Sequence, residues 1–206
     1  RKIGLVFNPG EYVEGFTSPL WMLLLTAVRF VFRAASPRHL TFVLSLALAA
    51  AAFSFLAWIN RRALREAEPG LGGGRPELNF FLPLVMAVST RAIIDFSTSG
   101  LSTPLVMLFA VLAAGELLRT RERPVRAGLL AGLGPLVRPD LAIVSLILLI
   151  HVFWRGKWKA GLRATALAAL PPLLYESFRV WYYASLLPNT FFAKSCSGAD
   201  FTQGFD

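Results

Sequence analysis

Long apolar runs alternate with short clusters of arginine and lysine along this chain, and this alternation most constrains its fold. The apolar runs cover residues 20–32, 40–59, 78–96, 104–118, 127–137, 141–154 and 164–181. A bilayer-spanning helix needs about 20 mainly apolar residues, so 40–59 and 78–96 each qualify. Hydrophobic residues make up 55% of the chain and charged residues only 16%, which excludes disorder, a coiled coil and an ordinary soluble enzyme. We therefore expect an all-α, polytopic transmembrane helical bundle.

Three basic clusters predict how these helices are oriented. They are Arg61, Arg62, Arg65 and Arg75; Arg119, Arg121, Arg123 and Arg126; and Arg155, Lys157, Lys159 and Arg163. Cytoplasmic loops are rich in such residues, so we place all three clusters on the cytoplasmic side. The formal net charge of +9 then reflects the orientation of the helices in the membrane, and we expect no nucleic-acid partner. Because an even number of crossings separates successive inside loops, 78–96 pairs with 104–118, and 127–137 pairs with 141–154.

This topology divides the chain into three parts. Residues 1–39 form a first extracytoplasmic loop, 40–181 the transmembrane helices, and 182–206 the start of a second extracytoplasmic loop. Both ends of 20–32 then lie outside, so we interpret it as an interfacial helix; the alternative is that it spans. The polar ends of the chain suggest a fragment of a longer protein.

Several expected helices begin with proline on the outer side. Ser18-Pro19, Ser36-Pro37 and Thr103-Pro104 each place a hydroxyl N-cap before the proline, and Pro139 also begins a helix. Helix N-termini present free N–H groups and partial positive charge, which suit phosphate. Each is also simply a good helix start, so only their convergence on one face indicates function.

Charged residues near the outer ends of the helices are the first candidates for ligand contact, because charge at membrane depth is costly. Arg91 and Asp95 lie four residues apart and can pair on one helix face, either as a structural ion pair or facing a polar substrate. Arg138 and Asp140 flank Pro139 at an expected outer turn. We expect Arg138 to contact an anion and Asp140 to orient it.

Polar residues outside the helices supply the remaining candidates. Glu11 and Glu14 lie in a turn-rich run and could bind a cation or sugar hydroxyls, or be solvated. The run offers no third metal ligand, so the sequence supports a metal site only weakly, and a divalent cation remains an open alternative. Lys194 follows a Pro-Asn-Thr sequence beside the expected outer cavity, whereas Tyr182 and Tyr183 fit an aromatic interface belt.

Four motifs, in order, resemble the GT-C membrane glycosyltransferases, and in particular the actinobacterial terminal β-(1→2)-arabinofuranosyltransferase type. They are FNPGEYVEGFTSPLW at 7–21, DFSTSGL at 95–101, VRPD at 137–140 and YYASLLPNTFFAK at 182–194. The resemblance implies a surface-lying helix in the first outer loop, and a multi-pass cell-membrane enzyme with its active site on the extracytoplasmic face. It also implies inverting transfer of a sugar from a polyprenyl-phosphate donor to a cell-envelope glycan or glycolipid. The sugar is arabinofuranose in this type, and mannose or another hexose stays open.

The reaction that the resemblance implies suggests roles for the candidate residues from their chemistry. Phosphate would be bound by Arg138, Lys194 and Arg91, and sugar by Asn8, Glu11, Glu14, Asp95 and Asn189. The general base is usually an Asp after the first transmembrane helix and would precede Arg1. Relatives often carry Glu where this chain has Ser102, which leaves the role of that position open.

Two other classes of function stay open on the sequence alone. A transporter or flippase of lipid-linked sugar would show inverted repeats and charges at mid-membrane, whereas these charges cluster at one edge. A non-catalytic membrane scaffold is the third reading.

Overall fold

The computed structural model describes residues 14–67, 81, 85, 89–119, 123–156 and 158–185. The regular secondary structure of these residues is helical and includes no strand, which confirms the all-α class. The elements, in chain order, are α1 (Pro19–Val31), α2 (Pro37–Ala67), α4 (Arg91–Thr98), α5 (Thr103–Leu117), α6 (Pro124–Val137), the 3-10 helix η1 (Pro139–Leu141), α7 (Ala142–Arg155) and α8 (Trp158–Tyr183).

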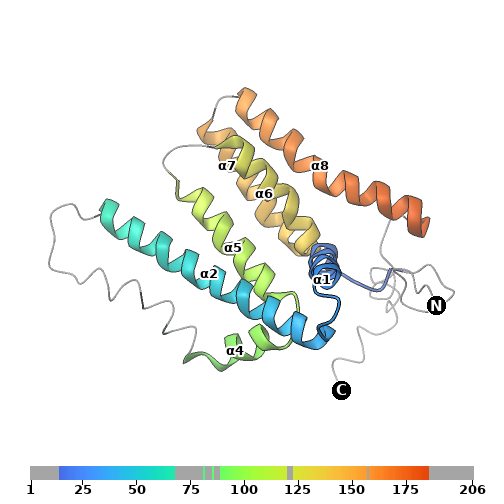
Figure 1. The fold of residues 1–206 in the computed structure, drawn as a ribbon. Helices are drawn as coiled ribbons and strands as arrows, with labels where there is room; N and C mark the ends of the chain where they lie inside the picture. The colour runs from blue at the N-terminus through green and yellow to red at the C-terminus, as the bar shows by residue number, and fades with distance from the viewer. Residues whose placement is uncertain are drawn as a thin grey trace, which may run out of the picture.

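The longer helices form a bundle in which α6 is central (Figure 1). Helix α6 packs on α5, α7 and α8, and α2 packs on α5 at the edge of the bundle. Helix α1 is seen almost end-on in Figure 1, whereas α2, α5 and α8 run across the picture. The short helix α1 therefore lies crosswise to the bundle, which is the geometry expected of an interfacial helix.

The two ends of the bundle differ in the residues they gather. At one end the Arg155 Nη1 donates to the carbonyl oxygen of Arg119, 2.9 Å away, so two basic clusters meet. At the other end, Trp21 of α1 and Val137 of α6 join one apolar cluster with Leu105 of α5. The α6–α7 hairpin thus brings two basic clusters to one end, as an even number of crossings requires. The side of a membrane that each end faces stays a prediction.

One helix is long and apolar enough to cross a membrane by length and composition among the described residues. It is the 27-residue stretch Pro37–Ala63 of α2, which has a mean hydropathy of 2.3 over an 18-residue window and contains the predicted span 40–59. Helices α4 and α5 are long and apolar enough to cross a membrane only when they are taken together, and this pair is bent by 114°. Helices α1 and α6 are apolar but shorter. A polytopic arrangement therefore rests on the sequence pattern.

The prediction of one continuous helix over 78–96 is wrong at its C-terminal end. Most of 78–90 lies outside the described residues, but Thr90 has extended backbone angles and α4 begins at Arg91. The Thr90 carbonyl accepts hydrogen bonds from the N–H groups of Ile93 and Ile94, at 3.0 and 3.3 Å. Threonine is favoured at such N-cap positions, so a new helix begins where hydropathy alone predicted continuity.

The predicted starts of the outer helices are correct at three of four sites, including Pro139, where η1 begins. Helices α1 and α2 begin at Pro19 and Pro37 as expected, whereas Thr103 is already the first residue of α5 and Ser102 is its N-cap. The Ser36 Oγ accepts the N–H of His39 at 3.4 Å, as a cap does. The Ser18 hydroxyl makes no cap and donates to the Ser102 Oγ instead, at 3.1 Å.

The second predicted hairpin is confirmed nearly to the residue, and small residues let it pack against α8. Helices α6 and α7 match 127–137 and 141–154, with the expected Arg138–Asp140 turn between them. A Cβ added at Gly128 would lie 2.5 Å from the Ala164 carbonyl oxygen, and one at Gly132 would lie 2.7 Å from that of Ala168. Paired small residues four apart let helix backbones approach this closely.

Candidate functional site

The first loop is attached to the end of α8 through one buried carboxylate. Glu14 is 3% exposed. Its Oε1 accepts a hydrogen bond from the Tyr175 hydroxyl at 2.6 Å, and its Oε2 accepts one from the Arg179 Nε at 2.8 Å. Both carboxylate oxygens therefore accept hydrogen bonds, and the one from Arg179 joins residues that are 165 positions apart in the sequence.

Arg179 lies at the centre of this network, which we call the Glu14–Arg179 cluster: Glu14, Tyr175, Glu176 and Arg179. The Arg179 Nη1 donates to the Glu176 Oε2 at 2.7 Å, and the guanidinium carbon lies 5.1 Å from the centre of the Tyr175 ring. The side chain of Arg179 is 12% exposed. Because Tyr175, Glu176 and Arg179 lie within about one turn of α8, helix spacing places their side chains close together on one face.

The charges of this cluster do not cancel. Two carboxylates, Glu14 and Glu176, share one guanidinium, and the buried Oε1 of Glu176 meets no donor in the described part of the chain. A buried acceptor without a partner is uncommon in folded proteins. The cluster therefore holds net negative charge and one unused acceptor at the end of α8.

Aromatic rings surround the end of α8 next to the cluster. Phe178 stacks on Tyr182 with ring centres 5.4 Å apart, and Tyr182 meets Tyr183 edge-on at 4.8 Å. Tyr183 ends the helix beyond the predicted span 164–181. Burial, followed by the negative charge of Glu14, raises the pKa of the Tyr183 phenol to about 12. Tyr183 is thus a buried, protonated neighbour of the carboxylate, and Ala184 leaves the helix with a φ of 50°.

Arg138 lies in the turn between α6 and η1, as the sequence predicts. Its backbone is extended, with φ −159° and ψ 143°, while the preceding Val137 is buried in the apolar cluster with Trp21. The Arg138 Nε donates to the Asp140 Oδ1 at 3.1 Å, and both side chains are about half exposed. Asp140 therefore orients Arg138, and the Nη atoms of Arg138 remain available to an anion.

Arg91 and Asp95 also pair as their spacing predicts, but on a separate element. The Arg91 Nε lies 3.7 Å from the Asp95 Oδ2, with the side chains 94% and 67% exposed. Helix α4, which carries both, packs on α2 and α5, whereas Glu14 packs on α8. The predicted site residues with a described structure thus lie on separate elements. Ligand contact by Arg91 and Asp95 remains a prediction.

The other predicted site residues fall in parts of the chain without a described structure. Asn8, Glu11, Asn189 and Lys194 lie outside the described residues. Among the residues that are described, no three His, Cys, Asp or Glu side chains come together to hold a metal. Tyr175 and Arg179 each donate to one oxygen of Glu14, and the predicted contact of Glu14 with sugar stays a prediction.

Sequence reasoning missed Tyr175, Glu176 and Arg179, although a signal was present. Glu176 and Arg179 lie three residues apart inside the apolar run 164–181. The rule that ionisable residues in such runs have partners and functions applied to them as it did to Arg91 and Asp95. The identity of their partner, 161 to 165 positions away, could come only from the tertiary structure.

The fold and this site define a helical protein in which a first-loop carboxylate docks on α8 and an arginine-bearing turn follows α6. The chain resembles two proteins named terminal β-(1→2)-arabinofuranosyltransferase. It is 29% identical to the one from Mycobacterium tuberculosis, over 98% of this chain and 33% of that protein. It is 29% identical to the one from Corynebacterium glutamicum, over 98% of this chain and 32% of that protein.

The chain thus spans about a third of the length of the curated relatives it matches. No family model matches the chain, and no solved structure matches it. The likeness agrees with the resemblance that the sequence motifs indicate.

Proposed function

We propose that this chain is part of an integral-membrane glycosyltransferase of the GT-C type. It moves arabinofuranose from a polyprenyl-phosphate donor to a cell-envelope glycan acceptor, on the extracytoplasmic face and by inverting transfer. The observation that carries the proposal is the likeness to two arabinofuranosyltransferases over 98% of the chain. The arrangement of charges at one end of the bundle supports it.

Arg138 is the residue we propose to bind the donor phosphate. It stands at the end of α6, and Asp140 fixes its Nε while the other guanidinium nitrogens stay available. Polyprenyl phosphate is already a good leaving group, so the protein's task is to stabilise the departing negative charge and to exclude water. Arg91 and Lys194 are proposed to assist, and deprotonation of the acceptor hydroxyl falls to a residue that precedes Arg1.

Glu14 is proposed to position the first loop. Because Tyr175 and Arg179 each hold one of its oxygens, Glu14 would anchor the chain just after Asn8 and Glu11, which we propose to bind the sugar together with Glu14. Asn189 and Asp95 are proposed as further sugar contacts, and a divalent cation remains an open alternative.

Transfer by the full-length protein tests the proposal. The purified enzyme is supplied with a synthetic prenyl-phosphate arabinofuranose and an arabinan oligosaccharide, and the product is measured by mass spectrometry. We expect Arg138→Ala to lower kcat/KM by about 100-fold, as loss of a charge-stabilising group does, with Arg138→Lys intermediate. Arg163→Ala, an exposed cation at the opposite end, is the matched control and keeps full activity.

Two results would contradict the proposal at different levels. Full activity of Arg138→Ala removes Arg138 from the phosphate site but leaves the enzyme class intact. Uptake of the lipid-linked sugar into vesicles, with no transfer to any acceptor, replaces the glycosyltransferase by a transporter or flippase.

A further inference from the structure

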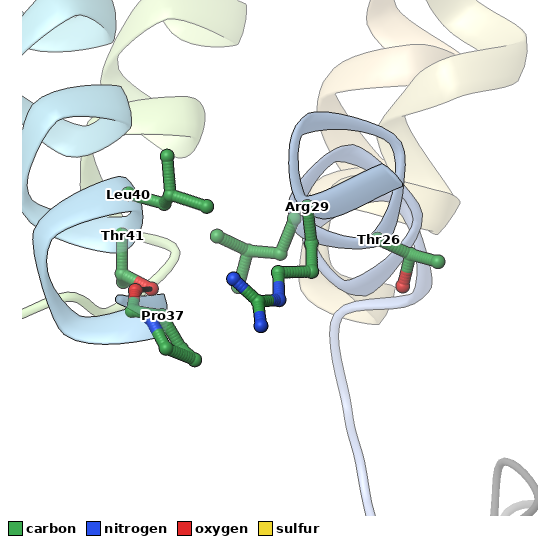
Figure 2. A pocket seen from close by; sticks show the side chains of 6 residues that line it. Thr26, Arg29, Pro37, Leu40 and Thr41 are labelled. Carbon is green, nitrogen blue, oxygen red and sulfur yellow. Dashed lines mark hydrogen bonds between the residues drawn. The ribbon is translucent and has the colours of Figure 1, made fainter. Parts of the chain in front are cut away.

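A groove opens between α1 and the first turns of α2, away from the Glu14–Arg179 cluster. It has a volume of about 290 Å³ and is lined by Leu25, Thr26, Arg29, Pro37, Leu40 and Thr41. Figure 2 shows the Arg29 side chain extending from α1 toward α2, where Pro37 and Thr41 lie. The groove therefore combines apolar walls with one guanidinium.

The groove lies in a strongly cationic part of the chain. Arg29, Arg33 and Arg38 fall within ten positions, and residues 15–65 contain neither Asp nor Glu. In the described structure the side chains of Arg29 and Arg33 donate only to backbone carbonyls, those of Ala35 and Phe30. No carboxylate of the described residues neutralises these three arginines, so the groove attracts anions.

The same junction exposes large apolar side chains. Phe30, Val31 and Phe32 are 68%, 71% and 57% exposed, and the Arg33 guanidinium lies 4.5 Å from the centre of the Phe30 ring. Three consecutive exposed apolar residues flanked by arginines are typical of a helix end that enters the boundary between lipid headgroups and acyl chains. This setting matches the headgroup of an anionic lipid better than a soluble anion.

We propose that the α1–α2 groove binds an anionic glycerophospholipid of the surrounding bilayer. Its phosphate contacts Arg29 and Arg33, and an acyl chain follows Leu25 and Leu40. The proposal rests on the membrane setting of the proposed function, but it concerns a second site. Arg29 is 11 residues from Ser18 along α1, or about 16 Å at the rise of an α-helix, so one phosphate cannot serve both this groove and the first-loop end of α1.

Native mass spectrometry of the full-length protein tests this site. The protein is titrated in detergent with phosphatidylglycerol or with phosphatidylcholine, and bound lipids are counted. We expect Arg29→Gln to weaken phosphatidylglycerol binding about fivefold, since each basic residue near an anionic surface contributes about 1 kcal/mol, and to leave phosphatidylcholine binding unchanged. Arg29→Lys retains most of the binding.

Two controls separate binding in this groove from general attraction of anionic lipid to a cationic protein, and from binding of the sugar donor. Arg163→Gln removes an exposed cation at the opposite end of the bundle and should leave phosphatidylglycerol binding unchanged. Equal weakening by Arg163→Gln, or no change in Arg29→Gln, overturns the proposal. So does displacement by farnesyl phosphate that Arg29→Gln abolishes, since the groove would then hold the donor. If the unmodified full-length protein binds phosphatidylglycerol in this way but transfers no sugar, the proposed function is refuted and this inference stands.

Discussion

Removing the Arg179 guanidinium leaves the Glu14 carboxylate buried with a single donor, the Tyr175 hydroxyl. Arg179→Met keeps the apolar stem of the side chain and removes the charged hydrogen bonds to Glu14 and Glu176, at 2.8 and 2.7 Å. Breaking one side of a buried ion pair costs about 3–5 kcal/mol. Arg179 is 12% exposed and Tyr175 still reaches Glu14, so we expect the lower end, about 3 kcal/mol.

The effect should concentrate at the first loop, because Glu14 is its attachment to α8. Hydrogen exchange of the full-length protein measures it, and residues 14–18 should lose protection in Arg179→Met while α6 and α7 keep theirs. Glu14→Gln retains an acceptor for Tyr175 and leaves Arg179 paired with Glu176, so it should cost less, about 1–2 kcal/mol.

The double variant decides whether the two residues act as one unit. If Glu14 and Arg179 stabilise the loop together, Glu14→Gln in the Arg179→Met background should cost far less than it does alone, because the charge left unpaired is then removed. Additive effects of the two changes, or protection at 14–18 equal to that of the unmodified protein, would refute the reasoning about this cluster.

Three further substitutions test the packing and the turn. Gly128→Ala should destabilise the protein by about 1–2 kcal/mol, because the new Cβ would lie 2.5 Å from the Ala164 carbonyl oxygen. Gly115→Ala, whose Cβ would meet only side-chain ends, is the matched control and should be neutral or stabilising; thermal unfolding compares the two, and equal midpoints would contradict the close approach of α6 and α8. Ser18→Ala should cost about 1 kcal/mol in the same assay for its hydrogen bond to the α5 N-cap, and no change would mean that this bond does not stabilise the fold. Asp140→Ala should change stability by less than about 1 kcal/mol yet lower kcat for sugar transfer, and unchanged transfer would mean that it does not orient the phosphate ligand.

Local sequence signals predicted the elements that local chemistry determines. The Arg138-Pro139-Asp140 turn and the flanking helices follow from an apolar run interrupted by a proline and two charges, and the structure has them at nearly those residues. The pairs Arg91–Asp95 and Arg138–Asp140 follow from spacings of four and two residues. These contacts need no information about the rest of the fold.

The contacts that determine the site are long-range, and the sequence pattern could not supply them. Glu14 was a candidate because it is an acid in a polar loop, but its partners on α8 depend on how the first loop crosses the bundle. The break at Thr90 was missed because hydropathy averages over a window, whereas a single extended residue ends a helix. The approach of Gly128 to Ala164 depends equally on tertiary packing.

The end of the bundle with Glu14 and Arg138 must face away from the cytoplasm if the proposed function is correct. Labelling of single cysteines in intact cells measures this, in the full-length protein with its other cysteines replaced, Cys196 included. Asp140→Cys should react with a membrane-impermeant maleimide, and Arg163→Cys should react only after the membrane is permeabilised. The opposite pattern, or equal labelling of both variants in intact cells, would contradict this orientation and the proposed site with it.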